Sequence, residues 1–112
     1  SGLSLRKRLE KARSLGYTVK ILFIYLSSPE LCIQRVAARV AKGGHDVPKA
    51  DIRRRFSRAN FNFQYVYKDL ADEWNLFYNA GDNIYQVAVG DRRGELILDE
   101  GKYAKWNEMV KS

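Results

Sequence analysis

The chain has little of several residue types that mark other classes of protein. It contains one cysteine, one histidine and two prolines among 112 residues. One cysteine cannot close an internal disulfide, and one histidine with one cysteine cannot build a zinc centre. No apolar run reaches the length that spans a bilayer, and no signal-peptide pattern opens the chain. We therefore expect a cytoplasmic protein with no metal site of its own and no membrane span.

A glycine-rich phosphate loop is also missing, since the pattern G-x-x-x-x-G-K-[ST] does not occur. What the chain has instead is focused positive charge. Residues 35–58 hold eight lysines and arginines against two aspartates, which gives +6 of a total net charge of +7. Such a field attracts a polyanion, for example a chain of phosphates.

Apolar periodicity predicts an α/β fold in which residues 1–112 form a single domain or a fragment of one. The predicted helices are residues 3–15, 29–42, 49–71 and 103–110, and the predicted strands are residues 17–26, 74–79, 85–89 and 95–98. The continuous apolar run in the first strand predicts a parallel strand covered on both faces. The last two strands predict a terminal β-hairpin. Two central strands are too few for a doubly wound sheet, so we expect further strands upstream.

Arginines are concentrated on the two helices that flank a short glycine turn. They are Arg35 and Arg39 on the first helix, and Arg54, Arg55 and Arg58 on the second. Because the turn is short, the two sets can face each other across a cleft that binds phosphate. The alternative is a solvated helix surface with ordinary ion pairs.

Two further positions, His45 and Asn79, are candidates for a site. His45 lies in the turn and can contact phosphate, although a lone histidine beside an aspartate is more often bonded to its neighbour. Asn79 ends a predicted strand, at the edge where α/β folds bind ligands. Cys32 lies in the first turn of a helix, and we interpret it as a small buried apolar residue. Aromatic side chains between residues 56 and 67 can stack on bases, but helical spacing favours packing for most of them.

Six short segments together resemble the C-terminal half of the zeta toxin family, and most closely its small stand-alone bacterial branch. They are residues 28–31 (SPEL), 35–37 (RVA), 39–40 (RV), 43–48 (GGHDVP), 52–56 (IRRRF) and 70–74 (LADEW). The resemblance covers essentially the whole chain. It implies a P-loop kinase-like, three-layer α/β fold with a mobile helical lid at about residues 40–58.

The resemblance also implies a function. Better-known members of the family use ATP and Mg²⁺ to phosphorylate UDP-N-acetylglucosamine, a sugar nucleotide, and a small antitoxin holds them inactive. By this likeness, Arg39 and Arg55 would be catalytic and bind the ATP phosphates during transfer, with Arg54 and Arg58 as further contacts. Arg35 and Asn79 would lie by the adenine.

The family's phosphate loop, magnesium ligands and catalytic aspartate would all belong to a missing N-terminal half. We therefore expect little catalysis from this chain alone. Two alternatives stay open. One is a non-enzymatic nucleic-acid-binding module that uses basic helices at residues 3–15 and 49–62, although no recognised DNA- or RNA-binding motif is present. The other is a degenerate family member kept as a regulator.

Overall fold

The computed structural model describes residues 2–111, and side chains from residue 4 to residue 111. The elements in chain order are α1 (Gly2–Ser14), β1 (Lys20–Tyr25), α2 (Pro29–Ala41), α3 (Lys49–Asn62), the π-helix η1 (Phe63–Tyr67), α4 (Lys68–Leu70), β2 (Glu73–Asn79), β3 (Ile84–Asp91), β4 (Gly94–Ile97) and α5 (Glu100–Lys111). The predicted elements are confirmed in kind and order. The α/β class and the terminal hairpin are confirmed as well.

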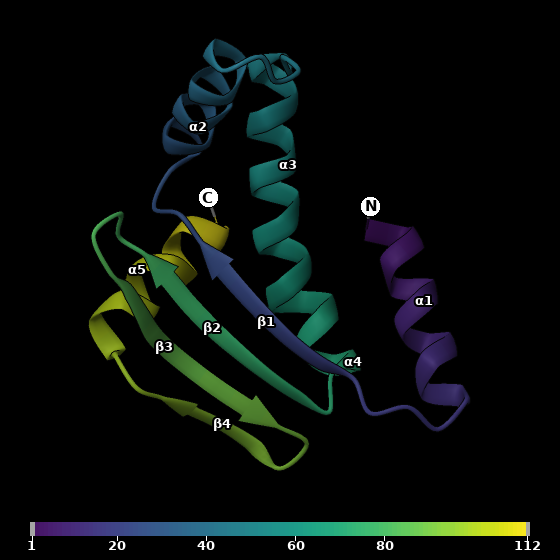
Figure 1. Cartoon of the computed structure of the whole chain (residues 1–112). Helices are drawn as coiled ribbons and strands as arrows, with labels where there is room; N and C mark the ends of the chain where they lie inside the picture. Colours follow the sequence, from purple (N-terminus) through teal and green to yellow (C-terminus); the bar gives the residue numbers. More distant parts are fainter. Residues whose placement is uncertain (1, 112) are drawn as a thin grey trace.

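The described strands form one mixed sheet in the order β1-β2-β3-β4. β1 and β2 are parallel, and α2 and α3 make the crossover between them. β3 and β4 follow as antiparallel neighbours. The carboxyl ends of β1 and β2 lie at one edge of the sheet, and α2 extends beyond this edge (Figure 1). This placement brings the basic helices to the edge where α/β folds bind ligands.

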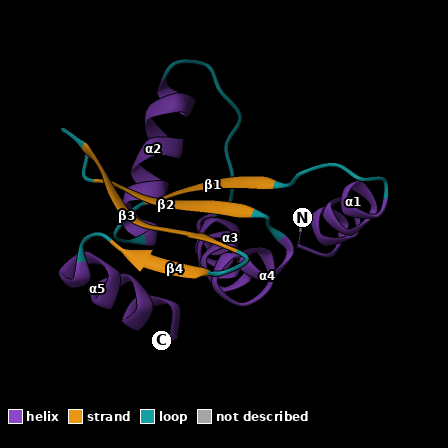
Figure 2. Cartoon of the chain, turned by 90° about the horizontal axis from the view of Figure 1, so that it is seen from below, coloured by secondary structure: helices purple, strands orange, loops and turns teal. Residues whose placement is uncertain are grey.

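The core lies between the sheet and the helices α3, α4 and α5, which share one side of it (Figure 2). The largest fully buried side chains are Phe63, Leu76, Val87 and Trp106. Phe63 stacks on Phe23 of β1 with ring centroids 4.7 Å apart, and its edge meets Trp74 and Trp106. The aromatic cluster thus fixes β1 and β2 against η1 and α5.

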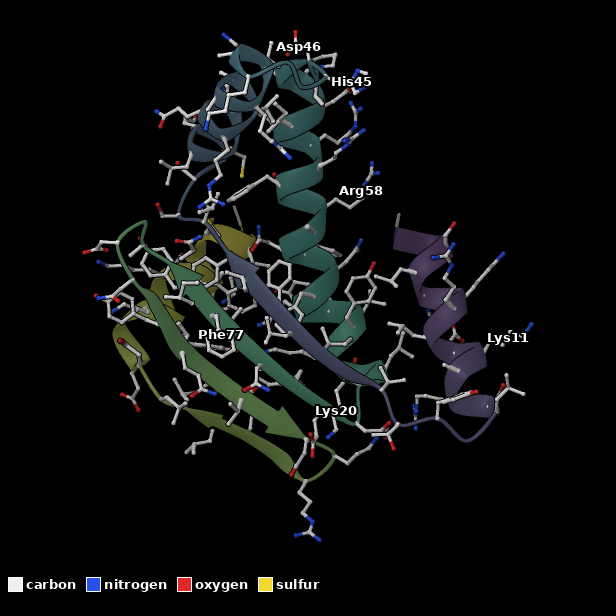
Figure 3. All side chains as sticks on the ribbon, in the orientation of Figure 1. Lys11, Lys20, His45, Asp46, Arg58 and Phe77 are labelled. Atoms are coloured by element: carbon white, nitrogen blue, oxygen red, sulfur yellow. The ribbon has the colours of Figure 1, made fainter. Side chains whose placement is uncertain are left out.

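The opposite face of the sheet is open among the described residues, so the prediction that β1 is covered on both faces is wrong for this part of the chain. Leu22 and Ile24 are 60% and 47% exposed, and Leu96 of β4 is 60% exposed. Because strand side chains alternate between faces, Phe23 and Tyr25 reach the helices while Leu22 and Ile24 do not. Figure 3 shows Phe77 on the same open face. The described fold has two layers where three were expected.

The long helix predicted at residues 49–71 is one continuous helix, in which the π-helical turn η1 lies between α3 and α4. A π-turn holds an extra residue and rotates the helix that follows. Phe63 and Tyr67 in this turn are both buried, whereas Val66, which the helical spacing predicted in the core, is only partly buried. Helical periodicity alone cannot reveal such an insertion.

Candidate functional site

The glycine turn sets how closely α2 and α3 approach. α2 begins at Pro29, a residue whose fixed φ suits the first turn of a helix. After α2, Gly43 adopts a φ of +94°, which favours glycine. A side chain at Gly44 would place its Cβ only 2.9 Å from the Arg39 carbonyl oxygen, which accepts a hydrogen bond from Gly44 N at 2.8 Å. The chain therefore reverses within a few residues, and α3 runs back beside α2.

A cleft of about 520 Å³ lies where α2, α3 and the carboxyl end of β1 meet. Its charged lining consists of Arg35 and Arg39 from α2 and Arg55 from α3. Asn79, the last residue of β2, also lines it. The structure thus brings four of the seven candidate site residues to one place. Arginine stays charged and forks onto two oxygens at once, so three guanidinium groups here suit a phosphate chain.

Some of the arginines on α2 and α3 form ion pairs with acidic side chains, and others do not. Arg53 Nη1 lies 2.7 Å from Glu30 Oε1, and Arg54 pairs with Asp51. Among the described residues, Arg35, Arg39 and Arg55 have no carboxylate within ion-pair distance. The cleft lining contains no aspartate or glutamate either. Its positive charge is therefore left available for an anionic ligand.

Three predicted contacts do not line the cleft. Arg54 turns to Asp51, and Arg58 points away from α2 (Figure 3). The expected stripe of Arg54, Arg55 and Arg58 on α3 is therefore split, since only Arg55 of the three lines the cleft. His45 is exposed in the turn, where Asp46 Oδ1 accepts a hydrogen bond from Val47 N at 2.9 Å. The aspartate, not the histidine, orders this turn.

A second hollow of about 270 Å³ adjoins the cleft, and Arg35 and Asn79 line both. Its apolar lining includes Leu26 and Leu31, and Tyr78 closes one side. Asn79 Oδ1 accepts a hydrogen bond from Gly81 N at 2.9 Å, which shapes the loop after β2. The Asn79 amide nitrogen stays available as a donor. The hollow therefore combines apolar walls with one cation, Arg35, and two side-chain amides, Gln34 and Asn79.

The cleft also has a lining that the sequence did not single out as a site. Its apolar part includes Val36, Ile52 and Phe56. Asn60 is 4% exposed, donates to the Phe56 carbonyl oxygen at 2.8 Å and accepts from Trp106 Nε1 at 2.9 Å. The sequence could have indicated this role, because Asn60 is a polar residue at a helical position that faces the core. Burial raises the pKa of the Cys32 thiol, so this residue contributes a neutral wall.

Residues 2–111 contain no cluster of three or more histidine, cysteine, aspartate or glutamate side chains that could hold a metal ion. The arginine cleft thus fits an anion but offers no carboxylate ligand for Mg²⁺. Within the same range, no helix is both long and apolar enough to cross a membrane.

Comparison of the chain with protein-family models, with curated proteins and with solved structures finds no match. The likeness to zeta toxins therefore depends on the sequence segments alone.

Proposed function

We propose that this chain is the lid and base-pocket part of a zeta-toxin-like phosphotransferase, which moves the γ-phosphate of ATP to a hydroxyl group. The observation that carries the proposal is the convergence of Arg35, Arg39 and Arg55 in one cleft beside the carboxyl ends of β1 and β2, with no acidic partner for any of them in the described part of the chain. Transfer of a phosphoryl group depends largely on positioning and on neutralising charge. Arginines on the two lid helices, Arg39 on α2 and Arg55 on α3, can position the phosphates and neutralise their charge.

In this proposal, the adenine and the phosphates of the nucleotide bind in different hollows. The adenine occupies the smaller hollow, between the Arg35 guanidinium and the Asn79 amide, against the apolar wall. The phosphates extend into the larger cleft toward Arg39 and Arg55. Arg39 and Arg55 stabilise the charge that develops on the transferred group, and closure of α2 and α3 excludes water.

The open side of the sheet supports a missing N-terminal half. In the described fold, β1 pairs only with β2, and its other edge carries no proline or bulge that would block a further strand. The phosphate loop, the magnesium ligands and the catalytic aspartate would lie in the half that pairs with this edge. With a protein that contains both halves, UDP-N-acetylglucosamine is the first phosphate acceptor to test. An antitoxin is the first binding partner to test.

Titration of the isolated chain with ATP, AMP and adenosine by calorimetry tests the proposal. We expect ATP to bind most tightly, because only its triphosphate reaches Arg39 and Arg55. Each charge-assisted hydrogen bond contributes about 1.5–3 kcal/mol, so ATP should bind at least about tenfold more tightly than AMP. Equal affinities for ATP, AMP and adenosine would sink the proposal.

A nucleic-acid-binding function is the second candidate, because basic side chains are exposed on α1 and aromatic side chains are exposed on α3 and η1. The charged residues of α1 are exposed, and Phe61 and Tyr65 are 51% and 45% exposed with ring centroids 4.7 Å apart. This function predicts affinity that rises with oligonucleotide length and falls steeply with salt. A length-independent affinity weaker than that for ATP argues against it.

A further inference from the structure

A separate cavity lies on the α5 side of the same sheet edge. Its volume is about 310 Å³, at the small end of the range for ligand pockets. Tyr25 and Tyr78 contribute from the ends of β1 and β2, and Lys105, Trp106 and Met109 contribute from α5. Nothing in the proposed nucleotide site uses α5.

The cavity has an aromatic wall. The Tyr25 and Tyr78 rings are stacked, with centroids 5.1 Å apart and planes 24° from parallel. The Trp106 ring lies 6.1 Å from that of Tyr25. Trp106 itself is 1% exposed, so the wall is held rigidly by the core. Tyr25 is 6% exposed as well, so Tyr25 and Trp106 support the wall from the core, and the half-buried Tyr78 presents the accessible ring on which a planar ligand can stack.

Positive charge borders the aromatic wall. Lys105 is exposed and has no ion-pair partner among the described residues. Lys102 also lines the cavity, but Asp99 Oδ2 lies 3.0 Å from its ammonium nitrogen, which leaves Lys105 as the available cation.

Neutral donors complete the lining. Burial raises the pKa of Tyr25, so its hydroxyl stays protonated, and no residue in the described range accepts a hydrogen bond from it. Ser27 offers a second hydroxyl. An ammonium group with two hydroxyl donors suits an anionic substituent.

The stacked tyrosines separate this cavity from the proposed nucleotide site. Tyr25 lines both the cavity and the arginine cleft, and Tyr78 lines both the cavity and the smaller hollow. The two sites therefore share a wall but use different cations. A ligand of one site need not occupy the other.

We propose that the cavity between α5 and the ends of β1 and β2 is a second binding site, for a planar aromatic ring that carries an anionic group. The ring stacks on Tyr78, which Tyr25 and Trp106 support from the core, and the anionic group meets Lys105 and the Tyr25 hydroxyl. An aromatic carboxylate and a nucleoside monophosphate both have this chemistry.

The single methionine of the chain provides the test, since Met109 lines the cavity. Protein labelled with ¹³C in the methionine methyl group gives one signal from inside the proposed site. The probes are benzoate with its neutral counterpart benzamide, and AMP with its neutral counterpart adenosine. We expect a saturable shift with at least one anion and an affinity at least about threefold lower for its neutral counterpart. The anion that shifts the Met109 signal shows whether the cavity binds an aromatic carboxylate or a nucleoside monophosphate.

Variants separate this proposal from the proposed function. Lys105→Ala should weaken the responding anion at least about threefold, whereas the control Lys111→Ala, also exposed on α5, should not. Arg55→Ala should leave the Met109 response unchanged, because Arg55 lines only the other site. The proposal is overturned if no anion shifts Met109 saturably, if the neutral counterparts bind equally well, or if Lys105→Ala has no effect.

Discussion

At the scale of single residues, the arginines show that the sequence predicts which helix a side chain belongs to but not the direction in which it points. Helical spacing placed five arginines on two helices. Their directions depend on neighbours far away in the chain: Glu30 of α2 binds Arg53, and the packing of α3 on α2 turns Arg55 inward and Arg58 outward. The helical repeat alone could not distinguish Arg55 from Arg58. Their proposed roles stay predictions.

Gly90 is a position where any side chain must displace the core. An added Cβ would lie 2.3 Å from the Trp74 ring, which is 4% exposed. Gly90→Ala should therefore lower the free energy of unfolding by about 1–3 kcal/mol, as overpacked cores do. Chemical denaturation measures the change. Gly101→Ala is the control, because its Cβ would meet only Asp99 Oδ1 at 3.7 Å, and it should leave stability equal or slightly higher.

Asn60 carries a buried hydrogen bond that no other described residue replaces. Its side-chain oxygen accepts from Trp106 Nε1 at 2.9 Å, and both residues are buried. Asn60→Ala leaves the indole N–H without a partner and should reduce the free energy of unfolding by about 1–3 kcal/mol. Asn62→Ala on the same helix, where no side-chain bond is made, should cost less. Equal losses in denaturant melts would contradict this account.

At the scale of elements, the α/β order, the parallel β1–β2 pair and the hairpin follow from local pattern, because apolar periodicity and glycine punctuation are local signals. Two features do not. The π-turn at η1 depends on how Phe63 and Tyr67 pack against the sheet. The exposure of Leu22 depends on what covers the sheet, which an apolar run does not specify.

Asp72 links three connecting segments at the end of the sheet where β1 and β2 begin. Its carboxylate accepts a hydrogen bond from Val19 N at 2.7 Å and pairs with Arg92 Nε at 3.3 Å. The Val19 bond, and then Arg92, hold the pKa of Asp72 below its ordinary value. A lowered folded-state pKa adds stability above the unfolded-state value of about 3.9, and that stability is lost as pH falls through the folded-state pKa.

Asp72→Asn should therefore lower the melting temperature at about pH 6 and flatten its decline toward about pH 2. Thermal melts across this pH range measure both effects. Asp69→Asn is the matched control, since Asp69 is exposed and has no ion pair in the described structure. An Asp72→Asn profile parallel to that of the unsubstituted chain would show that the carboxylate contributes nothing.

At the scale of the whole molecule, the open β1 edge and the exposed sheet face are the most unusual features. Leu22 and Leu96 are each 60% exposed on this face. An unprotected edge strand beside apolar surface promotes association between chains. We expect the isolated chain to self-associate as concentration rises.

The double variant Leu22→Lys and Leu96→Lys should reduce this association without lowering the melting temperature, because neither side chain is buried in the described fold. Sedimentation velocity follows the association. A monomeric unsubstituted chain at high concentration would show that the open face needs no cover. That result would also weaken the argument for a missing half.

The central claim is that the cleft arginines bind the phosphates of ATP, and a matched set of variants tests it most directly. Arg39→Ala, Arg55→Ala and Arg58→Ala each remove one positive charge from α2 or α3, but only Arg39 and Arg55 line the cleft. Calorimetric titration with ATP should show affinity about tenfold weaker for Arg39→Ala and Arg55→Ala and nearly unchanged for Arg58→Ala. Equal losses in all three variants would contradict the claim, because they would show only general attraction to a basic surface.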